Sequence, residues 1–144
     1  MDTPILPSEP EKAAILFANE AFYLAFDSRD MAAMEAIWAQ IEPVTCLHPG
    51  WDPMIGRANV LASWRAILNS PSPPRITALK PTVHLTTPAR DLALVICIEQ
   101  LEGASLIASN LFRLEGRTWH IMHHQASPTA HRPSDSAETS RQLQ

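Results

Sequence analysis

Hydrophobic and polar positions follow two different periods along the chain, a helical one in the first half and a strand-like one in the second. From Glu9 to about Phe26 the apolar residues recur every three or four positions, which predicts a helix with one buried face. Ser8 can cap this helix, Pro10 suits its first turn, and Glu11 reaches the free amide groups there. The apolar stripe that we expect to be buried consists of Ala14, Phe17, Ala18, Ala21, Phe22 and Ala25.

The next part of the chain predicts two shorter helices separated by an extended segment and a loop. Asp30 is placed to cap a helix over Met31–Ala39, and Val44–His48 reads as a short extended piece. Pro49, Gly50 and Pro53 then mark a loop. Gly56–Asn69 has its apolar residues on one side and predicts a third helix.

After Ser70 the apolar pattern changes to the two-residue period of β-strands. The separators between the apolar runs are short, which predicts that consecutive strands pair in an antiparallel manner. Pro81 interrupts the first run and suits an edge strand or a bulge. The predicted strands are Ile76–Thr86, Asp91–Gln100, Ala104–Leu114 and Arg117–Ala126.

This order predicts an α+β fold in which three N-terminal helices pack on a strongly curved, mainly antiparallel sheet. Such a half-barrel, shaped like a cone, leaves an internal pocket between the helices and the concave face of the sheet, where a small molecule could bind. We expect a single domain over residues 9–128. Residues 1–8 would form an N-terminal arm, and the polar residues 129–144 a flexible tail.

Composition and charge exclude several classes of partner. The 144-residue chain is 46 % hydrophobic and 18 % charged, with a net charge of −4, so it resembles a folded domain that binds neither nucleic acid nor an anionic membrane. The N-terminal segment lacks the pattern of a secretory signal, and no apolar run is long enough to span a bilayer, so we expect a cytoplasmic protein. Cys46 and Cys97 lie in apolar runs and are expected to be buried free thiols.

Several segments, taken in order, resemble the SnoaL-like domains of the nuclear transport factor 2-like superfamily. AFYLAFDSRDMAAMEAIWA is similar to their first two helices, HPGW and SWRAI to the strand, turn and helix that follow, and SNLFRLEGRTWHIMHHQASP to their last two strands. The resemblance extends from about Glu9 to Pro128. Members of the superfamily catalyse isomerisation, dehydration or cyclisation, or only bind and assemble, so the fold does not by itself determine the function.

The catalytic pattern of ketosteroid isomerase, a member of this superfamily, is not reproduced. Its oxyanion-binding tyrosine corresponds to Phe22, with Tyr23 adjacent, and its protonated aspartic acid corresponds to Asn110. Its carboxylate base corresponds to His48, if two residues are inserted before the strand. The resemblance leaves His48 as a candidate general base and Asn110 as a candidate polarising group. Equally, His48 could only anchor the turn at Pro49, and Asn110 could only satisfy a neighbouring polar group.

The pocket residues expected from the resemblance are mostly apolar or aromatic. If the face of the last strand that carries His120, Met122 and His124 points into the cone, Trp119 and Ile121 point outward on the convex face. A second copy of the chain would then cover them in a homodimer. The expected ligand contacts are Phe22, Trp51, Trp64, Phe112, Met122 and His124.

The histidines of the last strand do not predict a metal site. His120 and His124 lie about 13 Å apart along a strand, and His123 points to the opposite face. Nitrogen ligands of zinc lie about 2 Å from the metal, so no two of these histidines can share one ion locally. The sequence also lacks glycine-rich phosphate loops and the common hydrolase motifs, and we infer no cofactor.

Three functions agree with these observations. The leading hypothesis is a domain that holds a small, mostly apolar organic molecule in its cone. The first alternative is a cofactor-free isomerase, dehydratase or cyclase in which His48 is the base and Asn110 the polarising group. The second alternative is a non-catalytic module for dimerisation or assembly.

Overall fold

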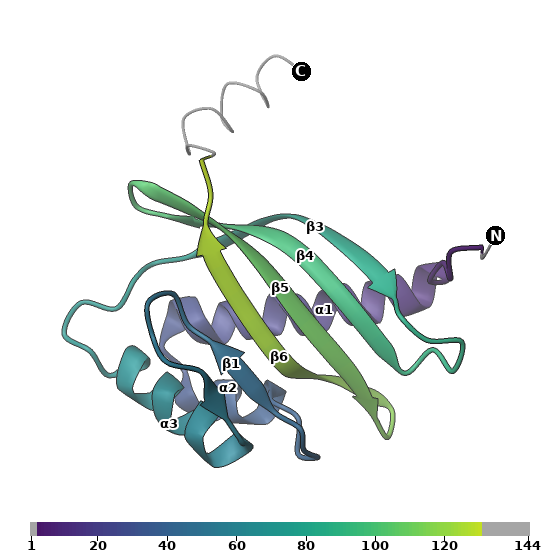
Figure 1. The fold of residues 1–144 in the computed structure, drawn as a ribbon, viewed down its shortest axis with the longest axis horizontal. Coiled ribbons are helices and arrows are strands. Elements are labelled where there is room, and N and C mark those ends of the chain that lie inside the picture. Colours follow the sequence, from purple (N-terminus) through teal and green to yellow (C-terminus); the bar gives the residue numbers. More distant parts are fainter. Residues whose placement is uncertain (1–2, 131–144) are drawn as a thin grey trace.

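The computed structural model describes residues 3–130, which form three helices and a six-stranded sheet (Figure 1). The predicted α+β class is confirmed, since the helices come first and the long strands follow. In chain order the elements are α1 (Glu9–Ser28), α2 (Met31–Ile37), β1 (Thr45–Leu47), β2 (Met54–Ile55), α3 (Arg57–Leu68), β3 (Thr77–Leu85), β4 (Leu92–Leu101), β5 (Ala104–Glu115) and β6 (Thr118–Pro128).

The strands are arranged in the order β2-β1-β6-β5-β4-β3, so the last strand of the chain lies inside the sheet. The long strands β3 to β6 pair with their chain neighbours in an antiparallel manner, as their short connections predict. The short strand β1 adds to β6 in parallel and carries β2 at the edge. We expected only a loop around β2, because two strand residues are too few to give an apolar period.

The first helix begins as predicted, but its buried face differs from the expected stripe. Ser8 and Glu11 form a capping box, with the Ser8 hydroxyl accepting from the Glu11 amide. Phe17, which we expected to be buried, is exposed, whereas the polar Asn19 and Tyr23 are enclosed. The face that contacts the sheet is therefore rotated from the purely apolar one, because Asn19 and Tyr23 find hydrogen-bond partners on β4 and β5.

Two bulges interrupt the regular alternation of the sheet. In β3, the register shifts between Leu79 and Thr82, at the Lys80–Pro81 pair, which agrees with the bulge or edge predicted for Pro81. In β6, His123 pairs with Leu111 and Ile121 with Phe112, so Met122 has no partner on β5.

The bulge at Met122 corrects the predicted faces of the last strand. Before it, Trp119 and Ile121 point to the helices and are buried, and after it His124 and Ala126 point to the same side. The prediction that Trp119 and Ile121 lie on the outer face is therefore wrong, because unbroken two-residue alternation does not hold across the bulge. An inserted residue exchanges the two faces of a strand at that point.

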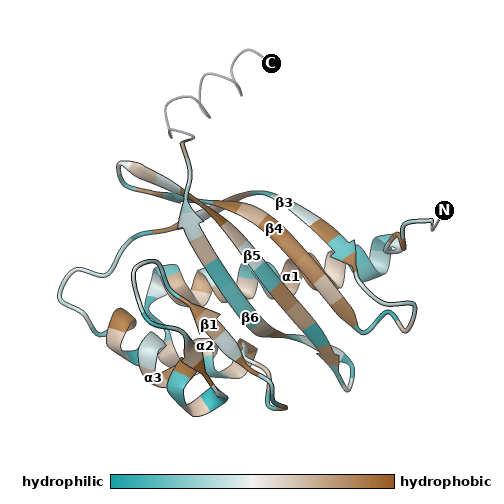
Figure 2. Cartoon of the chain, in the orientation of Figure 1, coloured by the Kyte–Doolittle hydropathy of each residue, from teal (hydrophilic) through white to brown (hydrophobic). Residues whose placement is uncertain are grey.

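Within the part of the chain that the structure describes, the helices cover one face of the curved sheet and none covers the other (Figure 1). The core lies between the two layers, and its largest fully buried side chains include Trp38, Trp64, Phe22 and Phe112. Figure 2 shows that β4, which lies inside the sheet between β5 and β3, is hydrophobic over most of its length. Among the described residues, no helix is long and apolar enough to cross a membrane.

The proposed domain limits remain predictions. Residues 3–8 have no regular structure, although the Arg90 guanidinium donates to the Leu6 carbonyl and holds this segment against the body of the protein. Most of the predicted tail, from residue 131 onward, lies outside the described residues.

Candidate functional site

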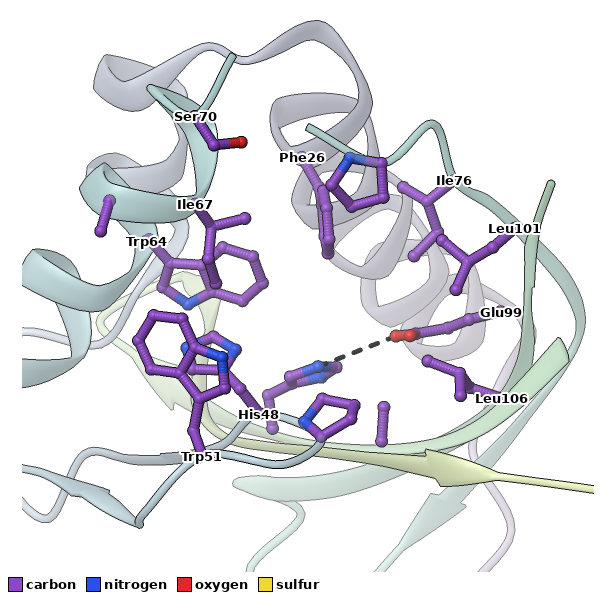
Figure 3. Close-up of a pocket in the computed structure, with 15 residues that line it drawn as sticks. Phe26, His48, Trp51, Trp64, Ile67, Ser70, Ile76, Glu99, Leu101 and Leu106 are labelled. Carbon is purple, nitrogen blue, oxygen red and sulfur yellow. Dashed lines mark ion pairs between the residues drawn. The ribbon is translucent and has the colours of Figure 1, made fainter. Parts of the chain in front are cut away.

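A cavity of about 500 Å³ lies between α1, α3 and the sheet (Figure 3). Its size is within the range of roughly 300 to 1,000 Å³ that ligand pockets usually have. The residues that line it come from α1, α3, the loop after β1, the segment before β3, and strands β4 to β6. They are Phe26, His48, Pro49, Trp51, Trp64, Ala66, Ile67, Ser70, Pro74, Ile76, Glu99, Leu101, Leu106, His124 and Ala126.

The cavity has an exposed mouth and a buried inner end. Pro49, Trp51 and Ala66 lie at the mouth, and the Trp51 side chain is 46 % exposed. Glu99 and His124 lie at the inner end, and each is only 2 % exposed. A ligand that enters beside Trp51 would therefore pass apolar walls before it meets these two polar groups.

Glu99 and His124 belong to a hydrogen-bond network that connects α1 with three strands. Tyr23 on α1 donates its hydroxyl to Glu99 Oε2 at 2.6 Å. Asn110 on β5 donates to the Tyr23 hydroxyl at 3.0 Å and to Asn19 Oδ1 at 2.9 Å. The other oxygen of that amide, Asn110 Oδ1, lies 2.6 Å from His124 Nδ1. These bonds satisfy polar groups that would otherwise be costly to bury.

Burial shifts the pKa of both groups at the inner end. It raises the pKa of Glu99 from 4.5 to about 7, an effect that the hydrogen bond from Tyr23 partly opposes. It lowers the pKa of His124 from 6.5 to about 3, helped by repulsion from His48 and His123. His124 Nε2 lies 3.8 Å from Glu99 Oε2, the contact that is dashed in Figure 3.

His48 forms part of the wall nearer to the mouth. Its Nε2 lies 2.8 Å from the Ser63 hydroxyl, which itself donates to the Val60 carbonyl, so His48 donates through Nε2 and leaves Nδ1 without a proton. Its ring packs beside those of Trp51 and Trp64. Burial lowers the pKa of His48 to about 4, and the imidazole is therefore neutral near pH 7.

Four of the predicted site residues line the cavity, and four do not. His48, Trp51, Trp64 and His124 line it. Phe22 and Phe112 are completely buried in the core, and Met122 occupies the bulge of β6 instead of the wall that we expected. Asn110 also lies behind the wall, with no exposed surface.

The position of Asn110 does not support its predicted role as a polarising group for a ligand. Both hydrogens of its amide nitrogen are donated inside the protein, to Asn19 and Tyr23. Asn110 instead orients His124, and through Tyr23 it contributes to the surroundings of Glu99. The sequence left two interpretations of Asn110 open, a polarising group for a ligand or a partner for neighbouring polar groups, and this geometry agrees better with the second.

Sequence reasoning missed Glu99 as a cavity residue. On β4, Ala93, Val95, Cys97 and Glu99 share the inward face, so alternation alone places this carboxyl toward the helices. A glutamate at an inward position of an apolar strand was the signal that could have found it. Tyr23 was noted only as a neighbour of Phe22, although the two residues lie on the same buried side of α1.

The thiols and histidines of the described residues form no metal site. Cys46 and Cys97 are buried and free, as predicted, and burial raises the pKa of each thiol. After the bulge, the His124 side chain lies on the face of the sheet that the helices cover, while the His123 ring bonds to Thr45. Within residues 3–130, no group of three His, Cys, Asp or Glu side chains is arranged to hold a metal ion.

Known structures share this architecture. A putative dehydratase of the nuclear transport factor 2-like family from Streptomyces avermitilis superposes with a TM-score of 0.76 and is 26 % identical, covering 87 % of this chain and all of its own. A putative calcium/calmodulin-dependent protein kinase type II association domain from Thiobacillus denitrificans has a TM-score of 0.67 and 30 % identity, over 88 % of this chain and 99 % of its own. A Nostoc punctiforme protein with a cystatin-like fold, 14 % identical with a TM-score of 0.71, shares the fold over 90 % of this chain and 99 % of its own.

Sequence comparisons agree with the structural ones. The F-box protein SKIP8 of Arabidopsis thaliana is 25 % identical over 116 residues, which are 79 % of this chain. The chain spans about half the length of that relative, since the match covers 49 % of it. The family model of the SnoaL-like domain matches residues 15–131. The chain therefore belongs to the SnoaL-like domain family, whose nuclear transport factor 2-like fold its structure shares.

Proposed function

We propose that this protein binds a small, mostly apolar organic molecule in the cavity between α1, α3 and the sheet. The observation that carries the proposal is the cavity itself, a space of about 500 Å³ that extends from the exposed ring of Trp51 to the buried pair of Glu99 and His124. Aromatic and aliphatic side chains form most of its wall, and such walls favour apolar ligands.

The charge of the lining narrows the class of ligand. Among the described residues that line the cavity, Glu99 is the one acid, and none is lysine or arginine. An anionic ligand would therefore meet no countercharge at the inner end and would face a carboxyl group. We expect an uncharged molecule with an apolar body, and with a polar atom at the end that reaches Glu99 and His124.

A cofactor-free enzyme that transfers protons is the second candidate function. The observation that favours it is the presence of three ionisable side chains, His48, Glu99 and His124, on the wall of one apolar cavity. Perturbed acids and bases in such a setting are typical of isomerases and dehydratases. The similarity to the Streptomyces avermitilis protein supports the same class. In this proposal His48 remains a candidate base, while Asn110 only positions other groups.

An experiment that closes the mouth of the cavity tests the binding proposal. The fluorescence of N-phenyl-1-naphthylamine, a neutral apolar probe, increases in a dry site, so titration gives its Kd. Ala66 lines the mouth on α3, and Ala62 lies one turn earlier on the same helix; both are exposed. We expect Ala66→Trp to weaken binding of the probe by about tenfold or more, since a filled entrance removes most apolar contacts.

Ala62→Trp is the matched control, because it adds the same ring to the same helix outside the cavity. It should leave the Kd unchanged. Equal binding by the wild type and Ala66→Trp would place the probe elsewhere and would contradict the proposal.

We further propose that two copies of the chain pair through the convex face of the sheet. In the middle of this face, Ile98 pairs with Ile107 and Leu94 with Leu111, and Ile96 lies between them on β4. Ile96 and Ile107 are 38 % and 46 % exposed, respectively, in the single chain. An apolar patch without charge at its centre fits an identical patch, which a twofold axis brings opposite it.

A further inference from the structure

We infer that Glu99 and His124 act together as a proton-transferring pair at the inner end of the cavity, on a neutral ligand that presents a hydroxyl or carbonyl oxygen to them. This inference rests on the proposed binding function, because the ligand must reach the inner end. It replaces the pairing of His48 with Asn110, since Asn110 is enclosed and Glu99 and His124 line the cavity.

The hydrogen bonds of Asn110 determine which nitrogen of His124 carries the proton. Asn110 donates both hydrogens of its amide nitrogen, to Asn19 Oδ1 and to the Tyr23 hydroxyl, and these bonds fix the orientation of the amide. Its oxygen, which can only accept, therefore faces His124. The His124 Nδ1 that lies 2.6 Å from this oxygen must therefore donate. Nε2 of the neutral ring is left as a free acceptor, and it is this nitrogen that faces Glu99.

Tyr23 fixes the position of the carboxyl group opposite this nitrogen. Its hydroxyl donates to Glu99 Oε2 at 2.6 Å and accepts from Asn110, so Tyr23 is bonded directly to Glu99 and is linked to His124 through Asn110. Glu99 Oε2 and His124 Nε2, 3.8 Å apart, would face each other as two acceptors if neither carried a proton. The pair is therefore arranged to hold one proton between two groups of different chemistry.

The surroundings of Glu99 favour keeping this proton on the carboxyl group. Tyr23 approaches from α1, Cys97 from β4 and Cys46 from β1, and burial raises the pKa of each of them, so they are neutral near pH 7. His48 and His124 are neutral as well, because burial lowers the pKa of both. None of the described residues around Glu99 is a cation near pH 7, and burial raises its pKa to about 7, where a carboxyl can both give and take a proton.

Such a pair can move a proton between two atoms of a ligand without a cofactor. His124 Nε2 takes a proton from the ligand, and the Glu99 carboxyl gives its own proton to another atom of the ligand, which forms an imidazolium and a carboxylate. The proton on Nε2 then passes to the carboxylate across the short gap between the two groups, which restores both. The ligand is isomerised, the proton count does not change, and Tyr23 and Asn110 serve as positioning residues.

Nitrogen NMR of the histidine rings tests the pair without any ligand. In the wild type we expect the His124 ring to stay neutral with its proton on Nδ1, while its Nε2 signal shifts as Glu99 titrates near pH 7. Glu99→Gln keeps the shape of the side chain but cannot ionise, so this shift should disappear. Glu102→Gln, an exposed change in the turn between β4 and β5, should leave it intact.

Naphthalene and 2-naphthol, which are nearly equal in size, test whether Glu99 and His124 contact an oxygen of the ligand. We expect the wild type to bind 2-naphthol about tenfold more tightly than naphthalene, which is the effect of one good hydrogen bond. In Glu99→Gln this preference should fall, because Tyr23 holds the amide oxygen and the side chain can no longer give a proton to the ligand oxygen or take one from it.

The outcomes separate the two proposals. If naphthalene binds but the preference for 2-naphthol is absent, or is equal in the wild type and Glu99→Gln, the inferred pair is wrong and the binding function stands. Failure of both compounds to bind would overturn the proposed function and, with it, the ligand contact inferred here. The inferred pair would also be overturned if the His124 ring became an imidazolium near its ordinary pKa. The same holds if its Nε2 signal did not change as Glu99 titrates.

Discussion

The enclosed carboxyl of Glu99 links the stability of the protein to pH. In the folded chain the pKa of Glu99 is about 7, whereas in the unfolded chain it has the ordinary value of 4.5. Between these values the folded protein carries a proton that the unfolded chain has lost. The contribution of Glu99 to stability is therefore fully present below pH 4.5 and is lost as the pH rises through 7.

Replacing Glu99 with glutamine should remove this loss. The free energy of unfolding of Glu99→Gln minus that of the wild type should increase by about 3 kcal/mol from pH 4.5 to pH 8, because each unit of pKa shift corresponds to about 1.36 kcal/mol. Urea unfolding at the two pH values measures the difference. Glu102→Gln, which is exposed, should show no such rise, and an equal effect of Glu99→Gln at both pH values would contradict the assignment.

The two cavity histidines act in the opposite direction. Burial lowers the pKa of His48 to about 4 and of His124 to about 3, so their contribution is present above pH 6.5 and is lost as the pH falls toward these values. Between pH 6.5 and 4.5, the two histidines outweigh the single carboxyl. Urea unfolding across this window should show a falling stability in the wild type and a steeper fall in Glu99→Gln, where the carboxyl no longer opposes it.

At the level of the element, the bulge in β6 allows one strand to serve both the core and the site. It lets Trp119 and Ile121 pack under the helices while His124, three positions after Ile121, still points to the same side. In a regular strand, residues separated by three positions point to opposite faces. Met122 is therefore the residue on which the orientation of His124 depends.

Deletion of Met122 should destabilise the protein severely. With the bulge removed, either Trp119 and Ile121 or His124 and Ala126 must turn outward, and exposing such core groups costs about 3 kcal/mol or more. Circular dichroism and urea unfolding would detect the loss. Met122→Ala keeps the strand length and the bulge and should cost less; a deletion variant as stable as Met122→Ala would show that the bulge is dispensable.

For the whole molecule, the free convex face determines the proposed oligomeric state. The helices, the cavity and its mouth lie on the concave side, so pairing through the convex side would leave the cavity accessible (Figure 1). In a twofold interface each residue occurs twice, and a single substitution changes both halves.

Ile96→Lys should convert a dimer into a monomer. Two lysines brought together at the centre of an apolar interface would weaken association by about 100-fold or more, because charges lose hydration there and repel each other. Sedimentation equilibrium over a range of concentrations measures this. Phe17→Lys, which alters an apolar residue on α1 that is 74 % exposed, is the control and should remain dimeric. A monomeric wild type, or dissociation by Phe17→Lys instead, would refute this interface.

Local patterns in the sequence predicted most elements and some of the site. The capping box of Ser8 and Glu11 and the cap at Asp30 were readable, because both depend on residues within one turn. The predicted second helix was too long: it ends at Ile37, and Trp38 is extended and bridges to Ile121 on β6. Its true end depends on this distant contact, which helical periodicity does not contain.

The sequence by itself determined the α+β class, the order of the helices and long strands, the bulge or edge at Pro81 and the aromatic and imidazole character of the pocket at His48, Trp51 and Trp64. These follow from the period of apolar residues, from turn residues and from resemblance. Only the tertiary structure decided that Tyr23 bonds to Glu99, 76 positions later in the chain, and that a bulge turns His124 inward beside it. The physical reason is that hydrogen bonds between distant side chains and the register between strands are set by packing of the whole domain, and a shift of one residue exchanges buried and exposed faces.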